Sequence, residues 1–273
     1  MSTTKSKGAA LITGASTGIG AIYADRLAKR GYDLILVARN QSRLAALADR
    51  LKKETGRSVE TIVADLNDKT DLARIETTLR DNASIALLVN NAGVGAAAPL
   101  LNSDVEKMDE MIRLNVGALT RLTYAAVPGF VARGAGTIIN ISSIVAISPE
   151  TLNGVYGGSK AFVLAFSQSL QHELAPKGIR VQAVLPGATA TEFWDIAGLP
   201  VHNLPAAIVM SAEDLVDAAL AGLDQGEVVT IPSLPDKDEW DRFEAARGAM
   251  SGKLSSAVPA PRYNIGHPRS VGA

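Results

Sequence analysis

Cysteine is missing from this chain of 273 residues. Disulfide bonds, thiolate metal sites and cysteine nucleophiles are therefore excluded. Histidine is scarce: His172, His202 and His267 are isolated from one another and show no metal-ligand spacing. We therefore expect no metal site, and we expect each histidine to be a surface or hydrogen-bonded side chain.

An excess of charge of either sign is also missing, because 27 lysines and arginines face 28 aspartates and glutamates. This balance gives no reason to expect nucleic acid or an anionic membrane surface as a partner. No apolar run reaches the roughly 18 residues of a membrane span. The apolar run near the N-terminus is too short for a signal peptide. We therefore expect a cytoplasmic protein without a membrane span.

Strand-like apolar runs alternate with helix-like segments along most of the chain. Hydrophobic residues make up 47% of the sequence, which is ordinary for a globular protein. We expect strands at 9–12, 33–38, 59–63, 85–89, 137–142, 179–185 and 227–231, and helices ending near residue 30 and at 40–56, 103–132, 154–176, 211–224 and 236–250. This alternation predicts an α/β fold: a Rossmann-type, doubly wound parallel sheet of about seven strands with helices on both faces.

The whole chain, 1–273, is expected to form a single domain, because no repeat and no linker separates two cores. The segment 192–211 is long, contains two prolines and follows a strand, which is typical of a substrate lid. The tail 251–273 is rich in proline, glycine and serine and carries no motif. Helices 103–132 and 154–176 carry apolar residues over a wide arc, which predicts a subunit interface in a homodimer or homotetramer.

A glycine loop, TGASTGIG at 13–20, lies between the first strand and the first helix. Glycines let the backbone approach a pyrophosphate, and the N-terminus of the helix supplies N–H groups and a partial positive charge. The spacing is G-x-x-x-G-x-G and not the commoner G-x-G-x-x-G. Glycine loops also occur as simple tight turns, but the flanking strand and helix favour nucleotide binding.

The residue after the second strand decides the expected cofactor. An NAD site would carry Asp or Glu there to accept hydrogen bonds from the ribose hydroxyls. This chain has Ala38 and then Arg39, and a guanidinium suits a ribose 2′-phosphate. NADP(H) is therefore expected, with NAD(H) the alternative. Arg39 could also be a solvated side chain at the start of the following helix, as Arg43 could.

Other strand ends carry polar groups. Asp65 follows the third strand, where its carboxylate could bind the adenine amino group or act as a local turn residue. The fourth strand runs into Asn90-Asn91-Ala92-Gly93, at an edge where open α/β sheets bind ligands. Asn115 stands among apolar residues in the middle of a helix, so its amide needs partners, which are either structural or functional.

A tyrosine and a lysine begin the helix expected at 154–176. Tyr156 and Lys160 are separated by one turn and share a face. A nearby ammonium favours the phenolate and is expected to lower the tyrosine pKa from about 10. Ser143 ends a buried strand and could meet the tyrosine, with a substrate oxygen between them. A Tyr–Lys pair at this spacing can also be no more than a shared helix surface.

Five motifs in register resemble the short-chain dehydrogenase/reductase family, in its NADP-preferring branch, over nearly all of 8–232. They are TGASTGIG (13–20), NNAG (90–93), Asn115, Ser143 with Tyr156-Gly-Gly-Ser-Lys160, and PGATAT (186–191). The resemblance implies that Tyr156 is the catalytic acid and base and that Ser143 polarises the substrate oxygen. Lys160 would bind the nicotinamide ribose and lower the tyrosine pKa. Asn115 would hold a water that links Lys160 to solvent.

The cofactor contacts expected from the residues or from the resemblance form a larger set. The resemblance places Thr189 and Thr191 at the nicotinamide carboxamide, and Asn91 near the ribose. It places Asp65 and Leu66 at the adenine. Thr17 departs from the family pattern, because many NADP-preferring members carry Arg or Lys there, and this leaves Arg39 as the main ligand of the 2′-phosphate. The full expected set is Gly14, Ser16, Thr17, Gly18, Ile19, Gly20, Arg39, Asp65, Leu66, Asn91, Ala92, Gly93, Tyr156, Lys160, Pro186, Gly187, Thr189 and Thr191.

The function expected from these motifs is reversible, NADPH-dependent reduction of a carbonyl to an alcohol. Val145, Leu152, Phe193 and Trp194 are candidates to line the pocket, which would suit a hydrophobic ketone, aldehyde or 3-oxoacyl substrate. They could equally be core or lid packing. The alternatives are an NAD-dependent alcohol dehydrogenase and a non-catalytic nucleotide-binding protein with the same fold.

Overall fold

The computed structural model describes residues 6–265 of the chain. These residues divide into two compact units, one that ends at Ser233 and a smaller one that begins at Leu234. The first holds the sheet and every motif named above.

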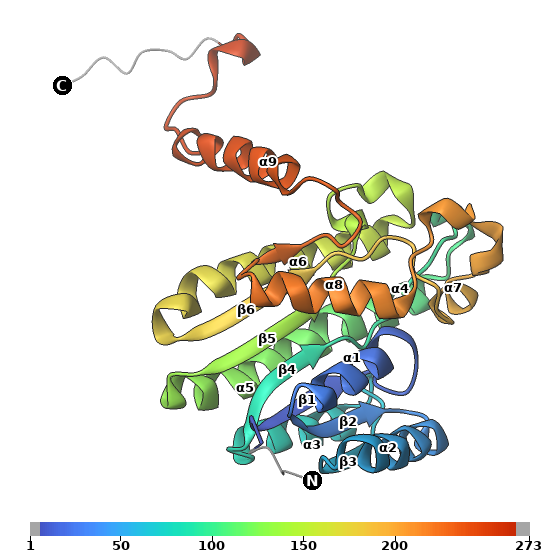
Figure 1. Ribbon diagram of the computed structural model, residues 1–273. Coiled ribbons are helices and arrows are strands. Elements are labelled where there is room, and N and C mark those ends of the chain that lie inside the picture. Colours follow the sequence, from blue (N-terminus) through green and yellow to red (C-terminus); the bar gives the residue numbers. More distant parts are fainter. Residues whose placement is uncertain (1–5, 266–273) are drawn as a thin grey trace. The chain divides into compact units, whose positions relative to one another are not determined.

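The first unit is built on a parallel sheet of seven strands (Figure 1), in the order β3-β2-β1-β4-β5-β6-β7. The strands are β1 Ala9–Thr13, β2 Asp33–Ala38, β3 Val59–Val63, β4 Ile85–Asn90, β5 Gly136–Ile141, β6 Ile179–Val184 and β7 Val229–Thr230. The order reverses between β1 and β4, so the polypeptide leaves these two strands toward opposite halves of the sheet. Such a switch point opens a crevice at the carboxyl ends of the strands. The doubly wound parallel sheet expected from the sequence is confirmed.

Two layers of helices cover the two faces of the sheet. Along β1 the side chains alternate, so Ala10 and Ile12 pack in one core and Leu11 packs in the other. The first core is closed by α1 Gly18–Lys29, α2 Gln41–Thr55 and α8 Ala212–Asp224. The second core is closed by α3 Lys69–Asp81, α5 Leu119–Arg133 and α6 Gly154–Leu174. Of these helices, α3 had no counterpart in the sequence analysis.

The helix expected at 103–132 is interrupted at its centre. α4 covers Val105–Ile112, a π-helical segment covers Arg113–Ala118, and α5 continues to Arg133. A π turn holds an extra residue and re-aims the side chains that follow it, which is why such turns recur at functional sites. Here it carries Asn115, which is buried. The helical segment expected at 103–132 is present as 105–133, but apolar periodicity does not reveal that residues 113–118 form a π turn.

Many apolar residues of the proposed interface helices are used inside the chain. Met111, Leu119 and Leu122 are buried in the chain's own cores. Tyr124 on α5 and Phe162 on α6 stay 69% and 39% exposed. The wide apolar arc is thus mostly explained without a partner, and the interface stays a prediction. Within residues 6–265, no helix combines the length and apolar character needed to span a bilayer.

The second unit consists mainly of α9, Lys237–Met250. Asp236 caps it by accepting a hydrogen bond from the backbone N–H of Asp238, as expected for Asp at an N-cap. The rings of Trp240 and Phe243 lie with their centroids 5.2 Å apart. Short 3-10 turns follow at Ser251–Lys253 and Pro261–Tyr263.

Candidate active site

A cavity of about 1290 Å³ opens at the carboxyl ends of the strands. Its walls come from segments between Gly14 and Ser233, so nearly the whole first unit contributes. Two residues of the predicted site, Gly20 and Asn115, do not line it and lie behind its wall. The predicted residues that do line it are Gly14, Ser16, Thr17, Gly18, Ile19, Arg39, Asp65, Leu66, Asn91, Ala92, Gly93, Ser143, Tyr156, Lys160, Pro186, Gly187, Thr189 and Thr191.

The glycine loop needs its glycines for two different reasons. Gly14 and Gly18 have positive φ values of 63° and 52°, a region that residues with a Cβ rarely adopt. Gly20 is required for space, because a Cβ there would lie 2.3 Å from the carbonyl oxygen of Gly14. The loop therefore folds tightly over the start of α1 and leaves its outer surface to the cavity.

The loop is fastened to the end of β4 by Thr13 and Asn91. Thr13 Oγ1 accepts hydrogen bonds from the backbone N–H groups of Asn91 and Ala92, both at 3.0 Å. Asn91 Nδ2 donates to the carbonyl oxygens of Thr13 and Gly14, at 2.9 and 3.1 Å. The side chain of Asn91 thus holds the glycine loop in place. Thr13 was not among the predicted site residues, although its place at the end of a buried strand is the signal that could have revealed it.

The N-terminus of α1 suits an anion. Most long helices of the described chain are capped by their own side chains, as α2 is by Asn40 and α3 by Asp68. Among the described residues, Thr17 makes no such cap for α1, whose first turn has no acidic residue. The N–H groups and the helix dipole are then directed at the cavity without a competing carboxylate. With the tight glycine loop, this arrangement fits a dinucleotide pyrophosphate.

Two arginines lie at the far end of the cavity, beyond β2. Ala38 is almost buried at the strand end, and the exposed Arg39 follows it. The described residues give Arg39 no ion pair. Arg43, on the first turn of α2, pairs with Glu192 at 2.7 Å, and the cavity wall includes both side chains. The bridge joins α2 to the first residue of the 192–211 segment.

Asp65 forms a local turn and lines the cavity as well. Its Oδ1 accepts from the backbone N–H of Asn67 at 3.0 Å, and its own N–H donates to Asp71 at 2.8 Å. Leu66 beside it is buried. Both readings of Asp65 are therefore compatible with its position, since one carboxylate oxygen shapes the turn and the residue still faces the cavity.

Ser143, Tyr156 and Lys160 converge at the inner end of the cavity. Ser143 follows β5 and donates from Oγ to the carbonyl oxygen of Pro186 at 3.4 Å, and Tyr156 lies in the first turn of α6. Ser142 Oγ donates to the carbonyl oxygen of Lys160 at 2.7 Å, which fastens this turn of α6 to the end of β5. Ser143, Tyr156 and Lys160 are all buried, and all three line the cavity.

Burial shifts the two titratable groups in opposite directions, because it disfavours the charged form of each. It raises the pKa of the Tyr156 hydroxyl to about 12, against which the hydrogen bond with Ser143 acts in the lowering direction. It lowers the pKa of the Lys160 ammonium to about 8. The lowered tyrosine pKa expected from Lys160 is therefore wrong for the protein's own residues. Desolvation is the largest cause of the raised tyrosine pKa, and Lys160 Nζ donates to the carbonyl oxygen of Ile141 at 2.9 Å.

Asn115 links the π-helical segment to the catalytic helix. Its Nδ2 donates to the Val94 carbonyl oxygen at 2.9 Å and to Ser159 Oγ at 3.1 Å, and its Oδ1 accepts from the Val94 N–H at 3.0 Å. Both amide hydrogens are thus used by the protein, so a water held by this side chain would have to bind Oδ1. A Cβ on Gly93 would lie 3.0 Å from that oxygen and 3.4 Å from Lys160 Nζ. The glycine keeps the space between the two groups open.

The 192–211 segment and Val94 form the remaining wall. α7, Phe193–Ile196, begins the segment, and the Phe193 ring lies 5.7 Å from the Tyr156 ring. Trp194 is buried and donates from Nε1 to the Thr189 carbonyl oxygen at 2.9 Å. At the other end, Met210 pairs with Thr189 in an isolated parallel bridge. The lining residues expected for a pocket all contribute to it: Val145, Leu152, Phe193 and Trp194.

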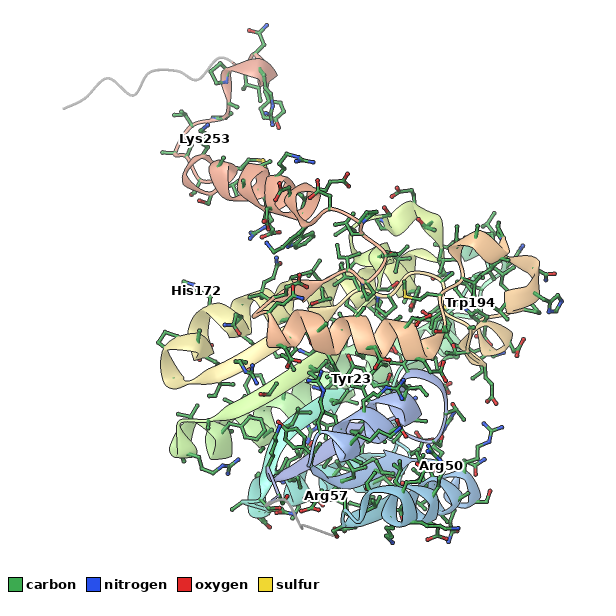
Figure 2. All side chains as sticks on the ribbon, in the orientation of Figure 1. Tyr23, Arg50, Arg57, His172, Trp194 and Lys253 are labelled. Carbon is green, nitrogen blue, oxygen red and sulfur yellow. The ribbon has the colours of Figure 1, made fainter. Side chains whose placement is uncertain are left out.

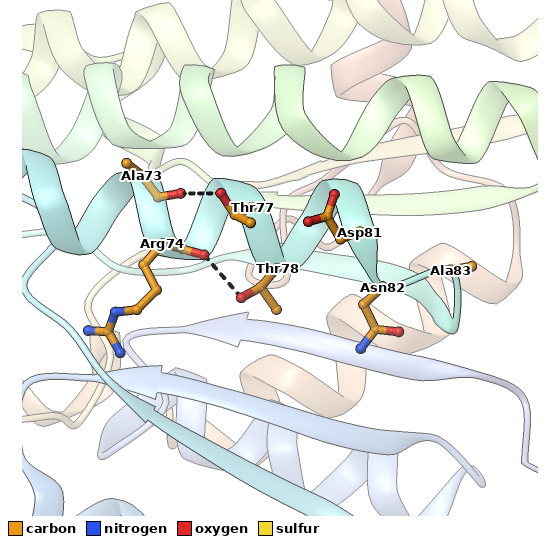
Figure 3. Close-up of a pocket in the computed structure, with 7 residues that line it drawn as sticks. All are labelled: Ala73, Arg74, Thr77, Thr78, Asp81, Asn82 and Ala83. Carbon is orange, nitrogen blue, oxygen red and sulfur yellow. Dashed lines mark hydrogen bonds between the residues drawn. The ribbon is translucent and has the colours of Figure 1, made fainter.

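A second depression lies on the outer surface of α3 (Figure 3). Its lining residues are Ala73, Arg74, Thr77, Thr78, Asp81, Asn82 and Ala83. The hydroxyls of Thr77 and Thr78 donate to the carbonyl oxygens of Ala73 and Arg74 in the same helix. These hydroxyls are therefore used within the helix, and the depression shares no residue with the cavity.

Comparisons with known proteins agree with this geometry. The family model for short chain dehydrogenase matches residues 8–197. A short-chain dehydrogenase from Sphingobium yanoikuyae, solved in complex with NADPH, is 49% identical, with a TM-score of 0.91 over 94% of this chain and 99% of that one. The bulky-bulky ketone specific alcohol dehydrogenase from Comamonas testosteroni is 44% identical, with a TM-score of 0.87 over 95% and 99%.

More distant relatives have other substrates in their names. The very-long-chain 3-oxoacyl-CoA reductase of Anas platyrhynchos is 37% identical over 193 residues, which is 69% of this chain and 62% of that protein. The present chain thus spans less than two thirds of that relative. The family match covers well over half of the chain and includes the glycine loop, Ser143, Tyr156 and Lys160. The chain belongs to the short-chain dehydrogenase/reductase family, as an NAD(P)-dependent oxidoreductase.

Proposed function

We propose that this protein reduces a bulky, uncharged ketone to the alcohol with NADPH, and catalyses the reverse reaction with NADP⁺. The observation that carries this proposal is the distribution of charge around the cavity. In the described part of the chain, the charged lining residues other than Lys160 lie toward the β2 and β3 ends: Arg39, Arg43, Asp65 and Glu192. The wall near Tyr156 is apolar instead, because Val145, Leu152 and Phe193 pack with it. Leu199 and Ile208 add further apolar lining to the cavity.

An apolar wall without a counter-charge disfavours a substrate that carries its own charge near the carbonyl, because an unpaired buried charge is costly. The names of the Comamonas ketone-specific enzyme and of the 3-oxoacyl-CoA reductases support a carbonyl substrate with hydrophobic groups. A ketone flanked by two large groups is the class that this wall suits best.

The protein's own residues hold the carbonyl oxygen and move its proton. The Ser143 side chain lowers the pKa of the Tyr156 hydroxyl, so the two hydroxyls lie close enough for one carbonyl oxygen to bind to both. Tyr156 then donates its proton to the alkoxide that develops on that oxygen. The nicotinamide, when bound, supplies the hydride to the carbonyl carbon in this direction and accepts it in the other.

Lys160 would hold the ribose of the cofactor and keep a positive charge near the tyrosine. With a pKa of about 8 it is mostly charged at neutral pH and can lose its proton to a relay at modest cost. Gly93 leaves space between Lys160 Nζ and Asn115 Oδ1, where a relay water would fit. Asn115 itself has a positioning role, because its side-chain amide joins Val94 to Ser159 of the catalytic helix.

The preference for NADPH rests on Arg39. It follows a strand end without a carboxylate, lines the cavity, and has no ion pair among the described residues. A free guanidinium there can bind a 2′-phosphate by charge-assisted hydrogen bonds. The NADPH complex of the Sphingobium protein supports the same preference.

A panel of carbonyl compounds assayed with NADPH and with NADH tests the proposal. We expect the highest kcat/KM for ketones with two apolar groups, lower values for small aldehydes and charged keto acids, and NADPH preferred throughout. Turnover of charged keto acids above that of neutral ketones would overturn the substrate class. Preference for NADH would overturn the cofactor choice. A 3-oxoacyl thioester that exceeds every simple ketone would assign the activity to the thioester class instead.

A further inference from the structure

Gly95 receives the tip of the Phe193 ring. A Cβ built on Gly95 would lie 2.2 Å from Phe193 Cζ and 2.9 and 3.0 Å from the two neighbouring ring carbons. Gly95 is not one of the glycines with positive φ in the described chain, so its backbone conformation does not require glycine. The missing side chain is needed for the ring alone. Gly95 therefore forms a notch in the 94–98 loop that fits the end of one aromatic side chain.

The notch is fixed in space by hydrogen bonds on both sides. Asn115 holds the N–H and the carbonyl oxygen of Val94. On the other side Asn153 donates from Nδ2 to the Ala98 carbonyl oxygen at 2.7 Å. The N–H of Ala97 donates to the carbonyl oxygen of Ala197, at 3.0 Å, which ties the loop to the end of α7. A loop held at three points cannot retreat easily from an added methyl group.

The other sides of the Phe193 ring face the catalytic tyrosine and a second aromatic residue. The centroid of the ring lies 5.7 Å from that of Tyr156 and 5.7 Å from that of Trp194, which it meets edge to face at 89°. Trp194 (Figure 2) is anchored by its hydrogen bond to Thr189. Phe193 thus fills the space between the notch and Tyr156, beside the place where a carbonyl group bound to Tyr156 would lie.

We propose that Phe193, seated in the Gly95 notch, is the specificity-determining residue that limits the size of the smaller group on the ketone. This inference rests on the proposed function and adds the residue pair that sets the limit. The notch exists because Gly95 has no side chain. A methyl group there must push the ring out of the notch into the cavity, and loss of the ring must open the same space.

Three variants test the pair: Gly95→Ala, Phe193→Ala and the double variant. The substrates are aryl ketones whose second group grows from methyl to propyl to phenyl. We expect Phe193→Ala to raise kcat/KM for the diaryl ketone relative to the methyl ketone by about ten-fold or more, the scale of added methylene groups in an apolar pocket. We expect Gly95→Ala to lower the same ratio by a similar factor. In the Phe193→Ala background, Gly95→Ala should have little further effect, because its action passes through the ring.

Gly158→Ala is the matched control. It adds a methyl group on α6, between Tyr156 and Lys160, at an exposed position where its Cβ meets no atom within 4 Å. Its ratio of kcat/KM for the diaryl ketone to kcat/KM for the methyl ketone should equal that of the wild type. NADPH affinity, measured by fluorescence, should be unchanged in all four variants. Equal effects on every ketone, or additive effects in the double variant, would overturn the proposal.

One readout does not depend on turnover. The chain has two tryptophans, so a Trp240→Phe background leaves Trp194 as the one source of tryptophan fluorescence. Displacement of the Phe193 ring by Gly95→Ala should change the Trp194 emission, and Gly158→Ala should not. If no ketone is reduced but the emission changes, the proposed function fails while the notch is upheld. If the emission and the ketone ratios both stay as in the wild type, the notch is refuted.

Discussion

Lys160 Nζ lies 5.9 Å from the centroid of the Tyr156 ring and donates its hydrogen bond to Ile141 instead. The Ser143 side chain lowers the pKa of the tyrosine hydroxyl. Lys160 and Tyr156 thus share a wall without a hydrogen bond between their polar ends. Lys160 can act on Tyr156 through its charge alone.

Tyr156→Phe should abolish most turnover and leave the cofactor bound. The substitution removes the proton donor and keeps the ring that packs against Phe193. We expect kcat to fall by about 10²–10⁴-fold, the usual loss for a general acid. Stopped-flow measurement of NADPH oxidation with the best ketone checks this, and NADPH titration serves as the control for folding. Wild-type turnover in the variant would remove Tyr156 from the mechanism.

Lys160→Met should inactivate the protein without destabilising it. Burial lowers the folded-state pKa of Lys160 from 10.5 to about 8. Desolvation of the charged ammonium therefore destabilises the folded protein at neutral pH. A shift of this size corresponds to about 3 kcal/mol, from which the lost hydrogen bond to Ile141 must be subtracted. We expect the free energy of unfolding of the variant at pH 7 to equal or exceed that of the wild type.

The sign of the pH dependence follows from the same pKa values. Between pH 8 and 10.5 the unfolded wild type binds more protons than the folded protein, so its stability rises with pH in that window. The gain in the free energy of unfolding from Lys160→Met should be full below pH 8 and vanish above pH 10.5. Urea unfolding of both proteins at several pH values measures this gain. A variant less stable than the wild type at pH 7 would show that the lysine stabilises the fold.

Cofactor choice should depend on Arg39 and Ala38. Arg39→Ala removes a charge-assisted contact to the 2′-phosphate and should weaken NADPH by about ten- to a hundred-fold, with little effect on NADH. Ala38→Asp should shift the preference further, because it adds an acceptor for the ribose hydroxyls and a charge that repels the phosphate. The measurement is kcat/KM for both cofactors in the three proteins. Equal losses for both cofactors in Arg39→Ala would refute the 2′-phosphate contact.

Glu192→Gln should tighten NADPH binding. In the wild type Glu192 pairs with Arg43 beside Arg39, so it both occupies a second guanidinium and places a negative charge near the expected phosphate. The neutral amide releases Arg43 for the phosphate. We expect the NADPH Kd to fall by about two- to five-fold, a factor typical of exposed ion pairs, and the NADH Kd to stay unchanged. In an Arg43→Gln background the effect should disappear; if it persists, Arg43 is not the mediator.

The layers of the fold and the inner site were predictable because local signals agreed with the global pattern. Most strands of the sheet are largely apolar runs bounded by turn residues, and Ser143, Tyr156 and Lys160 lie at strand and helix ends that the topology must bring together. The resemblance to the family added the roles, which composition and spacing alone could not supply.

Other features depend on contacts between distant segments. The π-helical segment at Asn115 is stabilised by Val94 and Ser159, and nothing in the local apolar pattern marks it. The pKa of Tyr156 depends on how deeply the fold buries it, which spacing to Lys160 does not reveal. The Arg43–Glu192 pair joins residues 149 positions apart. Gly95 looks like an ordinary loop glycine until Phe193 is placed against it.

The hydroxyl of Thr13 has a consequence for how the protein is made. It joins β1 to the residues after β4 across 78 positions of the chain, and the cavity wall continues to Ser233. Closing so long a loop costs entropy that only the finished contacts offset. During synthesis the glycine loop therefore leaves the ribosome long before the residues that hold it in shape. A nascent chain that stops before residue 90 should present its nucleotide loop unfixed, and cofactor should bind only near the end of translation.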